Sequence, residues 1–151
     1  MPVRIRPATP ADASRIADFN QRLAEESEEK RLDSQTVLAG VKALLGSPAH
    51  GQYYVADDGT EVVGQLLITY EWSDWRNAQF WWIQSVYVAP QFRRQGVFSA
   101  LYAHVAELAR GNPGVCGLRL YVEEHNSRAL ATYRALGLAS AGYHVMEVEL
   151  N

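Results

Sequence analysis

The sequence has little cysteine, little net charge and no long apolar run. It has one cysteine in 151 residues, so no internal disulfide can form. The formal charge of −3 and the isoelectric point near 5.8 argue against a general nucleic-acid-binding protein. No stretch is long enough to span a bilayer, and the first ten residues, MPVRIRPATP, contain no apolar signal region. We therefore expect a cytoplasmic protein with neither a nucleic-acid nor a membrane partner.

Metal ligands and reactive thiols are also scarce. Cys116 lies in the apolar run VCGLRLYV, where a buried inert thiol is expected and a catalytic cysteine is the alternative. The four histidines, at positions 50, 104, 125 and 144, do not have metal-ligand spacing, so the sequence predicts no metal site. There is no repeat and no linker-like boundary, so we expect a single domain over residues 1–151.

The first half of the chain reads as a strand, two helices and a hairpin. Thr9, followed by Pro10 and Asp12, is typical of a helix start. Asp33 is a candidate cap for a second helix that ends near Gly46. The expected elements are a strand at 3–6, a helix burying Ile16, Phe19 and Leu23, the second helix, and strands at 52–57 and 61–72 joined by the turn DDGT.

The second half alternates strands and helices. The run at 78–90 is nearly all apolar, which predicts a central strand buried on both faces. The expected elements after it are a helix at about 96–110, a buried strand at 115–124, a helix from Asn126 to Leu136, and one or two strands within 138–150. The hairpin implies antiparallel pairing and the strand–helix–strand order implies parallel pairing, so we predict a mixed sheet in an α/β domain.

The stretch QFRRQGVFSALYAHV, residues 91–105, places two arginines and a glycine at the first turn of a helix. The first amide groups of a helix have no internal partners and lie at the positive end of its dipole, so they can bind an anion such as a phosphate. The alternative is a solvated basic helix start in which Gly96 only makes a turn.

A second motif lies on the last helix. It consists of four residues spaced three, four and four positions apart: Asn126, Ala129, Tyr133 and Gly137. With the arginine–glycine loop after a buried strand, the sequence resembles the GCN5-related N-acetyltransferase family over essentially the whole chain. Arg93 and Gly96 match the family's phosphate loop, whereas Phe98 stands where glycine or alanine is usual. The resemblance implies that family's fold, with a mixed, mostly antiparallel central sheet and flanking helices.

The resemblance also implies acetyl-CoA as cosubstrate. Loop amides from Arg94 to Ser99 would bind its pyrophosphate, and strand amides near Tyr87 would pair with its pantetheine arm. Asn126 would contact that arm or serve only as a helix cap, and Tyr133 would be the general acid to the leaving thiolate or only a packed core residue. The implied cofactor-binding residues are Val86, Tyr87, Val88, Arg93, Arg94, Gln95, Gly96, Val97, Phe98, Ser99, Asn126, Ala129 and Tyr133.

The general base is not evident. The central strand contains neither a carboxylate nor a histidine, and Gln84 can hold a water but cannot keep a proton. Glu71, Asp74, Glu123 and His144 are the candidates elsewhere. We predict direct transfer of an acetyl group to a primary amine of a small molecule or peptide. The alternative is a sensor or regulatory domain that binds acyl-CoA without turnover.

The acceptor amine is suggested only by charge. In this family the first two helices usually form one wall of the acceptor site. In this sequence they carry the acidic residues Glu25, Glu26, Glu28, Glu29 and Asp33. An acidic wall would attract a cationic amine, although such runs are more often solvated helix faces. Trp72, Trp75, Trp81 and Trp82 would line an aromatic pocket for the acceptor. The alternative is that Trp81 and Trp82 pack in the core. A homodimer is possible by resemblance, and the sequence names neither the amine nor the length of the acyl chain.

Overall fold

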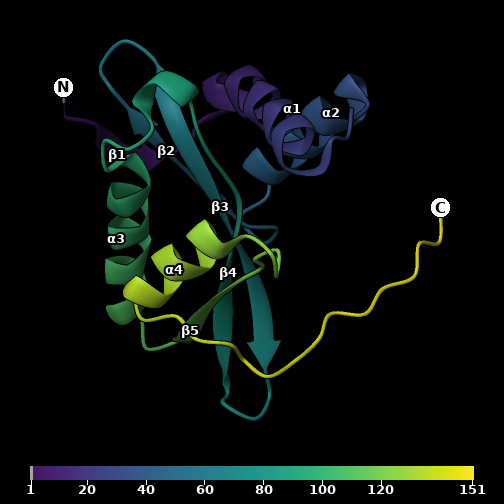
Figure 1. Ribbon diagram of the computed structural model, residues 1–151, viewed down its shortest axis with the longest axis vertical. Helices are drawn as coiled ribbons and strands as arrows, with labels where there is room; N and C mark the ends of the chain where they lie inside the picture. Colours follow the sequence, from purple (N-terminus) through teal and green to yellow (C-terminus); the bar gives the residue numbers. More distant parts are fainter. Residues whose placement is uncertain (1) are drawn as a thin grey trace. The chain divides into compact units, whose positions relative to one another are not determined.

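A computed structural model describes residues 2–151 (Figure 1), and the chain divides after Leu120 into two compact units. The prediction of one domain over the whole chain stays a prediction. The first unit contains β1 (Arg4–Pro7), η1 (Pro10–Asp12), α1 (Ala13–Glu28), α2 (Ser34–Leu45), β2 (Gln52–Asp57), β3 (Val62–Ser73), β4 (Ala78–Val88), η2 (Pro90–Phe92), α3 (Val97–Arg110) and β5 (Val115–Leu120). The second contains α4 (Ser127–Ala135).

The sheet of the first unit has five strands in the order β1-β2-β3-β4-β5. The first three pairings are antiparallel and the last, between β4 and β5, is parallel. This confirms the predicted mixed, mostly antiparallel sheet with flanking helices. The parallel pair is connected through α3, as strand–helix–strand units require.

Helices cover both faces of this sheet. Neighbouring residues on a strand point to opposite faces, and in β3 the side chain of Gln65 bonds to Asn20 of α1. A Cβ added to the adjacent Gly64 would lie 2.8 Å from Val97 of α3. The two helices therefore pack on opposite faces, and the glycine permits the close approach of α3.

The strand buried on both faces is β3. Every residue from Val62 to Ile68 is buried, whereas β4 alternates between buried and half-buried positions. The prediction of two-face burial for residues 78–90 was therefore wrong, although β4 is an internal strand between β3 and β5. The reason is position: β3 is the middle strand of the five and is covered from both sides.

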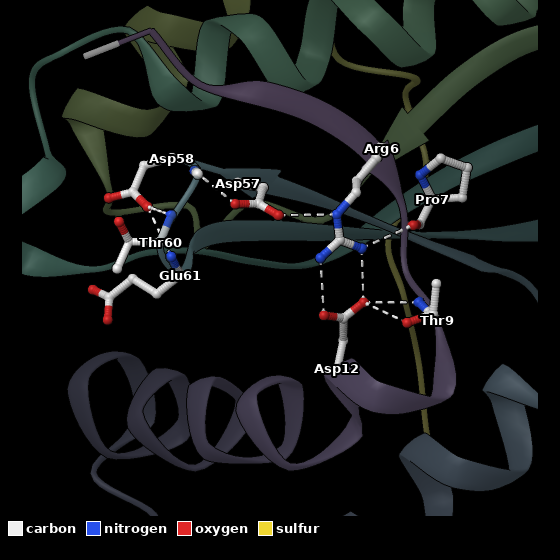
Figure 2. Close-up of polar contacts among 9 residues, drawn as sticks. Arg6, Pro7, Thr9, Asp12, Asp57, Asp58, Thr60 and Glu61 are labelled. Carbon is white, nitrogen blue, oxygen red and sulfur yellow. Dashed lines mark hydrogen bonds and ion pairs between the residues drawn. The ribbon is translucent and has the colours of Figure 1, made fainter.

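The start of α1 is tied to the sheet by Arg6 (Figure 2). Thr9 and Asp12 form a capping box around η1, as the sequence predicted. Arg6 donates to both oxygens of Asp12, at 2.9 and 3.1 Å, and to Asp57 of β2 at 3.1 Å. Because this guanidinium bonds Asp12, the pKa of that carboxyl is held below its usual value. Ile16 and Phe19 follow in the core and are fully buried.

The predicted burial of the strand at 115–124 was also wrong. β5 ends at Leu120, its residues are mostly half-buried, and Cys116 is exposed rather than buried. Within the first unit β5 pairs with β4 alone, so it is an edge strand of that unit. An edge position leaves one side of a strand open, whatever its apolar content.

The second unit is built around α4. Asn126 caps the helix through its side-chain oxygen, which accepts from the amide of Ala129 at 3.1 Å. The amide of Leu138 bonds to the carbonyl of Tyr133 and that of Gly137 to Arg134, the bonds of a glycine-terminated helix end. Residues 139–151 contain no strand, so the one or two strands expected within 138–150 are not formed.

The helices of residues 2–151 are all too short or too polar to cross a membrane.

Candidate active site

The end of β4 is irregular next to the loop with the two arginines. Val88 and Tyr87 pair with Gly64 and Gln65, but the next pair joins Gln84 to Leu67, so Ser85 and Val86 together face Leu66. Ser85 has a left-handed backbone, with φ 52°. Such a bulge bends the strand and changes the direction of its side chains.

Beyond this bulge β4 also parts from its parallel neighbour. The pairing with β5 ends where Ile83 faces Leu120. Among the strands of the first unit, Tyr87 and Val88 therefore pair with β3 only, and Val86 lies in the bulge. Within the described part of the first unit, no strand pairs with the other backbone edge of this segment.

The loop after β4 presents a row of free amides. Arg94 and Gly96 both have left-handed backbones, with φ 63° and 80°. Within residues 2–151, the amides of Arg94, Gln95, Gly96, Val97 and Ser99 donate to no other residue. Backbone that turns through left-handed residues into a helix start makes a concave anion site. A non-glycine residue held at positive φ is also strained, which is common at functional sites.

Arg93 lies at the entrance of this loop and is bonded within the protein. Its Nε donates to the carbonyl of Val88 at 2.8 Å, and its terminal nitrogen pairs with Glu26 of α1, also at 2.8 Å. The guanidinium lies 5.2 Å from the ring centre of Tyr87. The hydroxyl of Tyr87 donates to the other oxygen of Glu26. Glu26 therefore joins the end of α1 to the end of β4 and to the loop.

The charges in this cluster favour ionised Glu26 and protonated Tyr87. The bonds from Tyr87 and Arg93 lower the pKa of Glu26. Burial, and then the carboxylate of Glu26, raise the pKa of Tyr87. At neutral pH the cluster is thus a carboxylate held by a phenol and a guanidinium.

Phe98, the departure from the family's loop pattern, lies in the first turn of α3. Its ring centre is 6.2 Å from that of Tyr102, one turn further along the same helix. The ring thus packs along α3, and the loop keeps its left-handed turns despite the bulky residue.

Three of the predicted site residues lie on α4 in the second unit. Asn126 caps the helix, Ala129 donates to that cap, and Tyr133 lies one turn further on. Burial raises the pKa of Tyr133, so this phenol stays protonated at neutral pH. These residues form one group on α4, and residues 86–99 form the other in the first unit.

The carboxylates considered as general bases have other partners. Glu71 accepts from Trp82 at 2.7 Å and pairs with Arg119 at 3.1 Å, and these bonds lower its pKa. A lower pKa makes a weaker base. Glu123 accepts from the amide of His125 at 2.8 Å. Asp74 lies in the exposed turn between β3 and β4, and His144 lies in the exposed stretch 139–151. Gln84 donates to Thr69 at 2.6 Å.

The acidic run of α1 and α2 is divided among several roles. Glu26 belongs to the cluster with Arg93, Glu28 pairs with Lys30 at 3.6 Å, and Asp33 caps α2 by accepting from Thr36 at 2.9 Å. Glu25 and Glu29 are exposed. Of the tryptophans, Trp72 and Trp75 are exposed and Trp81 and Trp82 are half-buried.

A cavity of about 330 Å³ lies between α1, α2, β2 and β4. Its walls are mainly apolar and include Leu23, Val37 and Val41. Its polar side chains include Asn20, Tyr53 and Ser85, and Glu28 lies at its exposed side. Ser85 is the residue with the left-handed backbone in the β4 bulge, so the cavity reaches the strand segment that precedes the loop.

A family model described as "Acetyltransferase (GNAT) family" matches residues 15–138. The chain belongs to this family. Acetyl-CoA is the cosubstrate that GNAT enzymes generally use, and the activity of the chain is that of an N-acetyltransferase. Residues 2–151 contain no group of three or more histidine, cysteine or acidic side chains able to hold a metal ion.

Relatives of known sequence or structure agree with the assignment to the GNAT family. A thialysine N-epsilon-acetyltransferase from Caenorhabditis elegans is 32% identical, covering 83% of this chain and 76% of its own. The Bos taurus protein of the same name is 29% identical over 97% of this chain and 92% of its own. A crystal structure of a possible acetyltransferase from Clostridium difficile 630 is 42% identical, with a TM-score of 0.93 and coverage of 100% and 99%.

Sequence reasoning missed the cavity and the role of Glu26. Two signals for the cavity were present: Gln65 interrupts the apolar run VVGQLLI, and Asn20 follows the buried Phe19 on the inner side of α1. A polar residue within an apolar pattern requires a partner. The partner of Glu26 is 67 residues away in sequence, and no local pattern indicates it.

Proposed function

We propose that this GNAT enzyme transfers the acetyl group of acetyl-CoA to a primary amine at the end of β4. The supporting observation is that the amides of Arg94, Gln95, Gly96, Val97 and Ser99 donate to no residue within 2–151. They lie on a loop with two left-handed residues, directly after the segment of β4 that has lost its pairing with β5. Bound acetyl-CoA supplies the thioester that the amine attacks.

The phosphate-binding role falls on the loop. We assign the pyrophosphate to the amides of Arg94, Gln95, Gly96, Val97 and Ser99, with Phe98 packed along α3. The side chain of Arg94 adds a positive charge that can form a bidentate contact with phosphate. Arg93, bonded to Glu26 and Val88, holds the loop entrance in place. The strand amides of Val86, Tyr87 and Val88 pair with the pantetheine arm, and one of them polarises the thioester carbonyl.

The second unit supplies the acid. We assign Tyr133 as the proton donor to the leaving thiolate, because its phenol is protonated at neutral pH. A cysteine-like thiol has a pKa of about 8.5 and a free phenol about 10, so the thiolate is near enough in basicity for a phenol to bond and protonate it. Asn126 and Ala129, on the first turn of the same helix, contact the pantetheine arm.

The acceptor is proposed to be an amine on a lysine-like chain. Two relatives from different animals are named for N-epsilon acetylation of thialysine. The α1–α2 cavity, with apolar walls and a carboxylate at its exposed side, has the character that such a chain needs.

Thermal shift and thiol release test this proposal together. A ligand at 100 times its Kd stabilises a protein by about 2.7 kcal/mol, roughly 5–10 °C in Tm for a domain of this size. We expect this shift with acetyl-CoA and CoA but not with NAD, and thiol release when amines on lysine-like chains are added. A shift without release from any amine would instead support the acyl-CoA sensor.

Arg94→Gln tests the phosphate contact. We expect KM for acetyl-CoA to rise about tenfold with kcat unchanged, since the charge binds ground state and transition state alike. Arg110→Gln, at the exposed end of α3, is the matched control and should change neither constant. An unchanged KM for Arg94→Gln would remove Arg94 from the site.

A further inference from the structure

The hydrogen bonds beside the α1–α2 cavity form an uncharged network. Asn20 donates to the hydroxyl of Tyr53 at 3.2 Å. Gln65 donates to Asn20 at 2.9 Å and to the carbonyl of Ser85 at 3.0 Å. We call these four residues the polar floor. Gln65 is completely buried, and Asn20, Tyr53 and Ser85 line the cavity.

One acceptor of the polar floor, behind the cavity wall, has no hydrogen-bond donor among the described residues. The side-chain oxygen of Gln65 is buried and accepts no hydrogen bond from residues 2–151. Leaving a buried acceptor without a donor costs about 1–3 kcal/mol. Gln65 does not line the cavity, so a ligand meets only the polar groups of Asn20, Tyr53 and Ser85 there, and none of these carries a charge.

No charge on the floor is available to hold an ammonium ion. The titratable residues that line the cavity are Tyr53 from β2 and Glu28 from α1, and α2 and β4 contribute none. Burial raises the pKa of Tyr53, which keeps it a neutral phenol. Glu28 lies at the exposed side and already pairs with Lys30. Moving an ammonium from water to such a floor is unfavourable, whereas a neutral amine loses little.

We propose that the α1–α2 cavity admits the acceptor as a neutral primary amine on an unbranched aliphatic chain, and that this selection takes the place of a general base. The inference rests on the proposed function. It also accounts for the absence of a carboxylate or histidine from β4. The amine nitrogen lies toward the floor at Ser85, one residue from Val86, and its chain lies between the apolar side chains of α1 and α2.

The proton balance of the reaction agrees with this role. A neutral amine uses its lone pair to form the C–N bond while the C–S bond breaks, and the electron pair of that bond leaves with sulfur. Tyr133, the assigned donor, protonates the leaving sulfur, and the proton that the attacking nitrogen gives up converts the resulting phenolate back to the phenol. No separate base is consumed, because the amine enters without its extra proton.

A matched pair of acceptors tests this inference. Butylamine and 2-methoxyethylamine have the same chain length, but the ether oxygen lowers the ammonium pKa of the second. Below both pKa values we expect kcat/KM, calculated on total amine, to favour 2-methoxyethylamine by about tenfold for each unit that separates the two. The preference should vanish above both values, and the inflection in each pH profile should follow the amine used. Equal kcat/KM at pH 7, or one inflection shared by both amines, would overturn the proposal.

Two variants distinguish the effect of the polar floor on amine selection from that of the exposed carboxylate of Glu28. Asn20→Asp has the same shape but places a negative charge on the floor, so ammonium binds and the preference for 2-methoxyethylamine should disappear. Glu28→Gln should leave the slope and the inflection of the pH profiles unchanged. If the pH dependence of kcat/KM disappeared in Glu28→Gln, Glu28 would be the base and the inference would be contradicted. This outcome can be read even if Asn20→Asp does not fold.

A binding measurement gives an answer without turnover. We would titrate the CoA-bound protein with butylamine at pH 7 in buffers of different ionisation enthalpy. Binding of the neutral form should release about one proton per amine, because roughly one aliphatic amine in 10³ is neutral at this pH. No proton release, or no binding, would overturn the inference. Failure of the proposed function would give a different result: acetyl-CoA would cause no thermal shift, and no amine would cause thiol release.

Discussion

The two ends of helix α1 are each tied to the sheet by an arginine, and the two ties differ in burial. At the start of the helix, Arg6 bonds to Asp12 and Asp57, with 21% and 10% of the Arg6 and Asp12 side chains exposed. At the end, Arg93 bonds to Glu26, and 44% of each side chain is exposed. Burial makes an ion pair costly to break, and exposure lets water replace it.

The difference also separates stability from function. The Arg6 cluster joins β1, η1 and β2, none of which contributes a proposed cosubstrate-binding residue (Figure 2). The Arg93 cluster joins α1 to Val88 and the loop that carries the free amides. We therefore expect changes at the first cluster to affect mainly the free energy of unfolding, and changes at the second to affect mainly acetyl-CoA binding.

The largest effect is expected from Asp12→Ala. It removes the bidentate partner of Arg6 and half of the capping box, leaving Asp57 as the remaining carboxylate. We expect the free energy of unfolding to fall by about 2–4 kcal/mol, measured by urea denaturation. Asp58→Ala, in the neighbouring turn and outside the Arg6 contacts, is the control. A loss below 1 kcal/mol for Asp12→Ala would show that the Arg6 and Arg93 clusters do not differ in their contribution to the free energy of unfolding.

Acid should weaken the same cluster. The pKa of Asp12 is lower in the folded protein than its usual value of about 3.9, so its stabilising contribution is present above that pH. The contribution is lost as pH falls through the folded pKa, when the carboxylate takes up a proton. The wild type should therefore lose more stability than Asp12→Ala between about pH 5 and pH 2, by urea denaturation at each pH. If the wild type and Asp12→Ala lost the same stability over this pH range, the pH dependence would not come from Asp12.

A smaller change in stability is expected from Glu26→Gln. The pair is half-exposed, so the free energy of unfolding should change by less than about 1 kcal/mol. KM for acetyl-CoA should rise roughly tenfold, because Arg93 is released from its carboxylate and the loop entrance loosens. Steady-state kinetics with varied acetyl-CoA measure this effect, with Glu25→Gln on the same helix as control. An unchanged KM would limit Glu26 to packing.

The smallest effect is expected from Tyr87→Phe. It removes the hydroxyl that bonds to Glu26 but keeps the ring beside Arg93 and Phe19. The salt bridge from Arg93 stays, so we expect at most a threefold rise in KM for acetyl-CoA and about 0.5 kcal/mol of lost stability. Rises as large as that of Glu26→Gln would make the phenol, and not Arg93, the essential partner of Glu26.

Several local features around the proposed site were predicted from the sequence. Asp33 and Asn126 cap their helices as expected, through bonds that span three residues. The left-handed Gly96 and the start of α3 follow from a glycine just before a helix pattern. Such features depend on the backbone of a few neighbouring residues, so a single sequence is enough to indicate them.

Other features depended on residues far apart in the sequence. Burial of β3 instead of β4, exposure of Cys116, and the absence of strands from residues 139–151 depend on which elements cover which faces. An apolar pattern shows that a segment can be buried but not that another segment reaches it.

The sequence by itself determined the family, the order of the elements in the first unit, and the loop whose amides are proposed to hold phosphate. Tertiary structure alone decided that Arg93 pairs with Glu26, that Ser85 sits in a bulge, and that Asn20, Tyr53, Gln65 and Ser85 share one network. Helix starts and turns are fixed by hydrogen bonds between near neighbours. Ion pairs, bulges and cavities arise only where packing brings distant segments together.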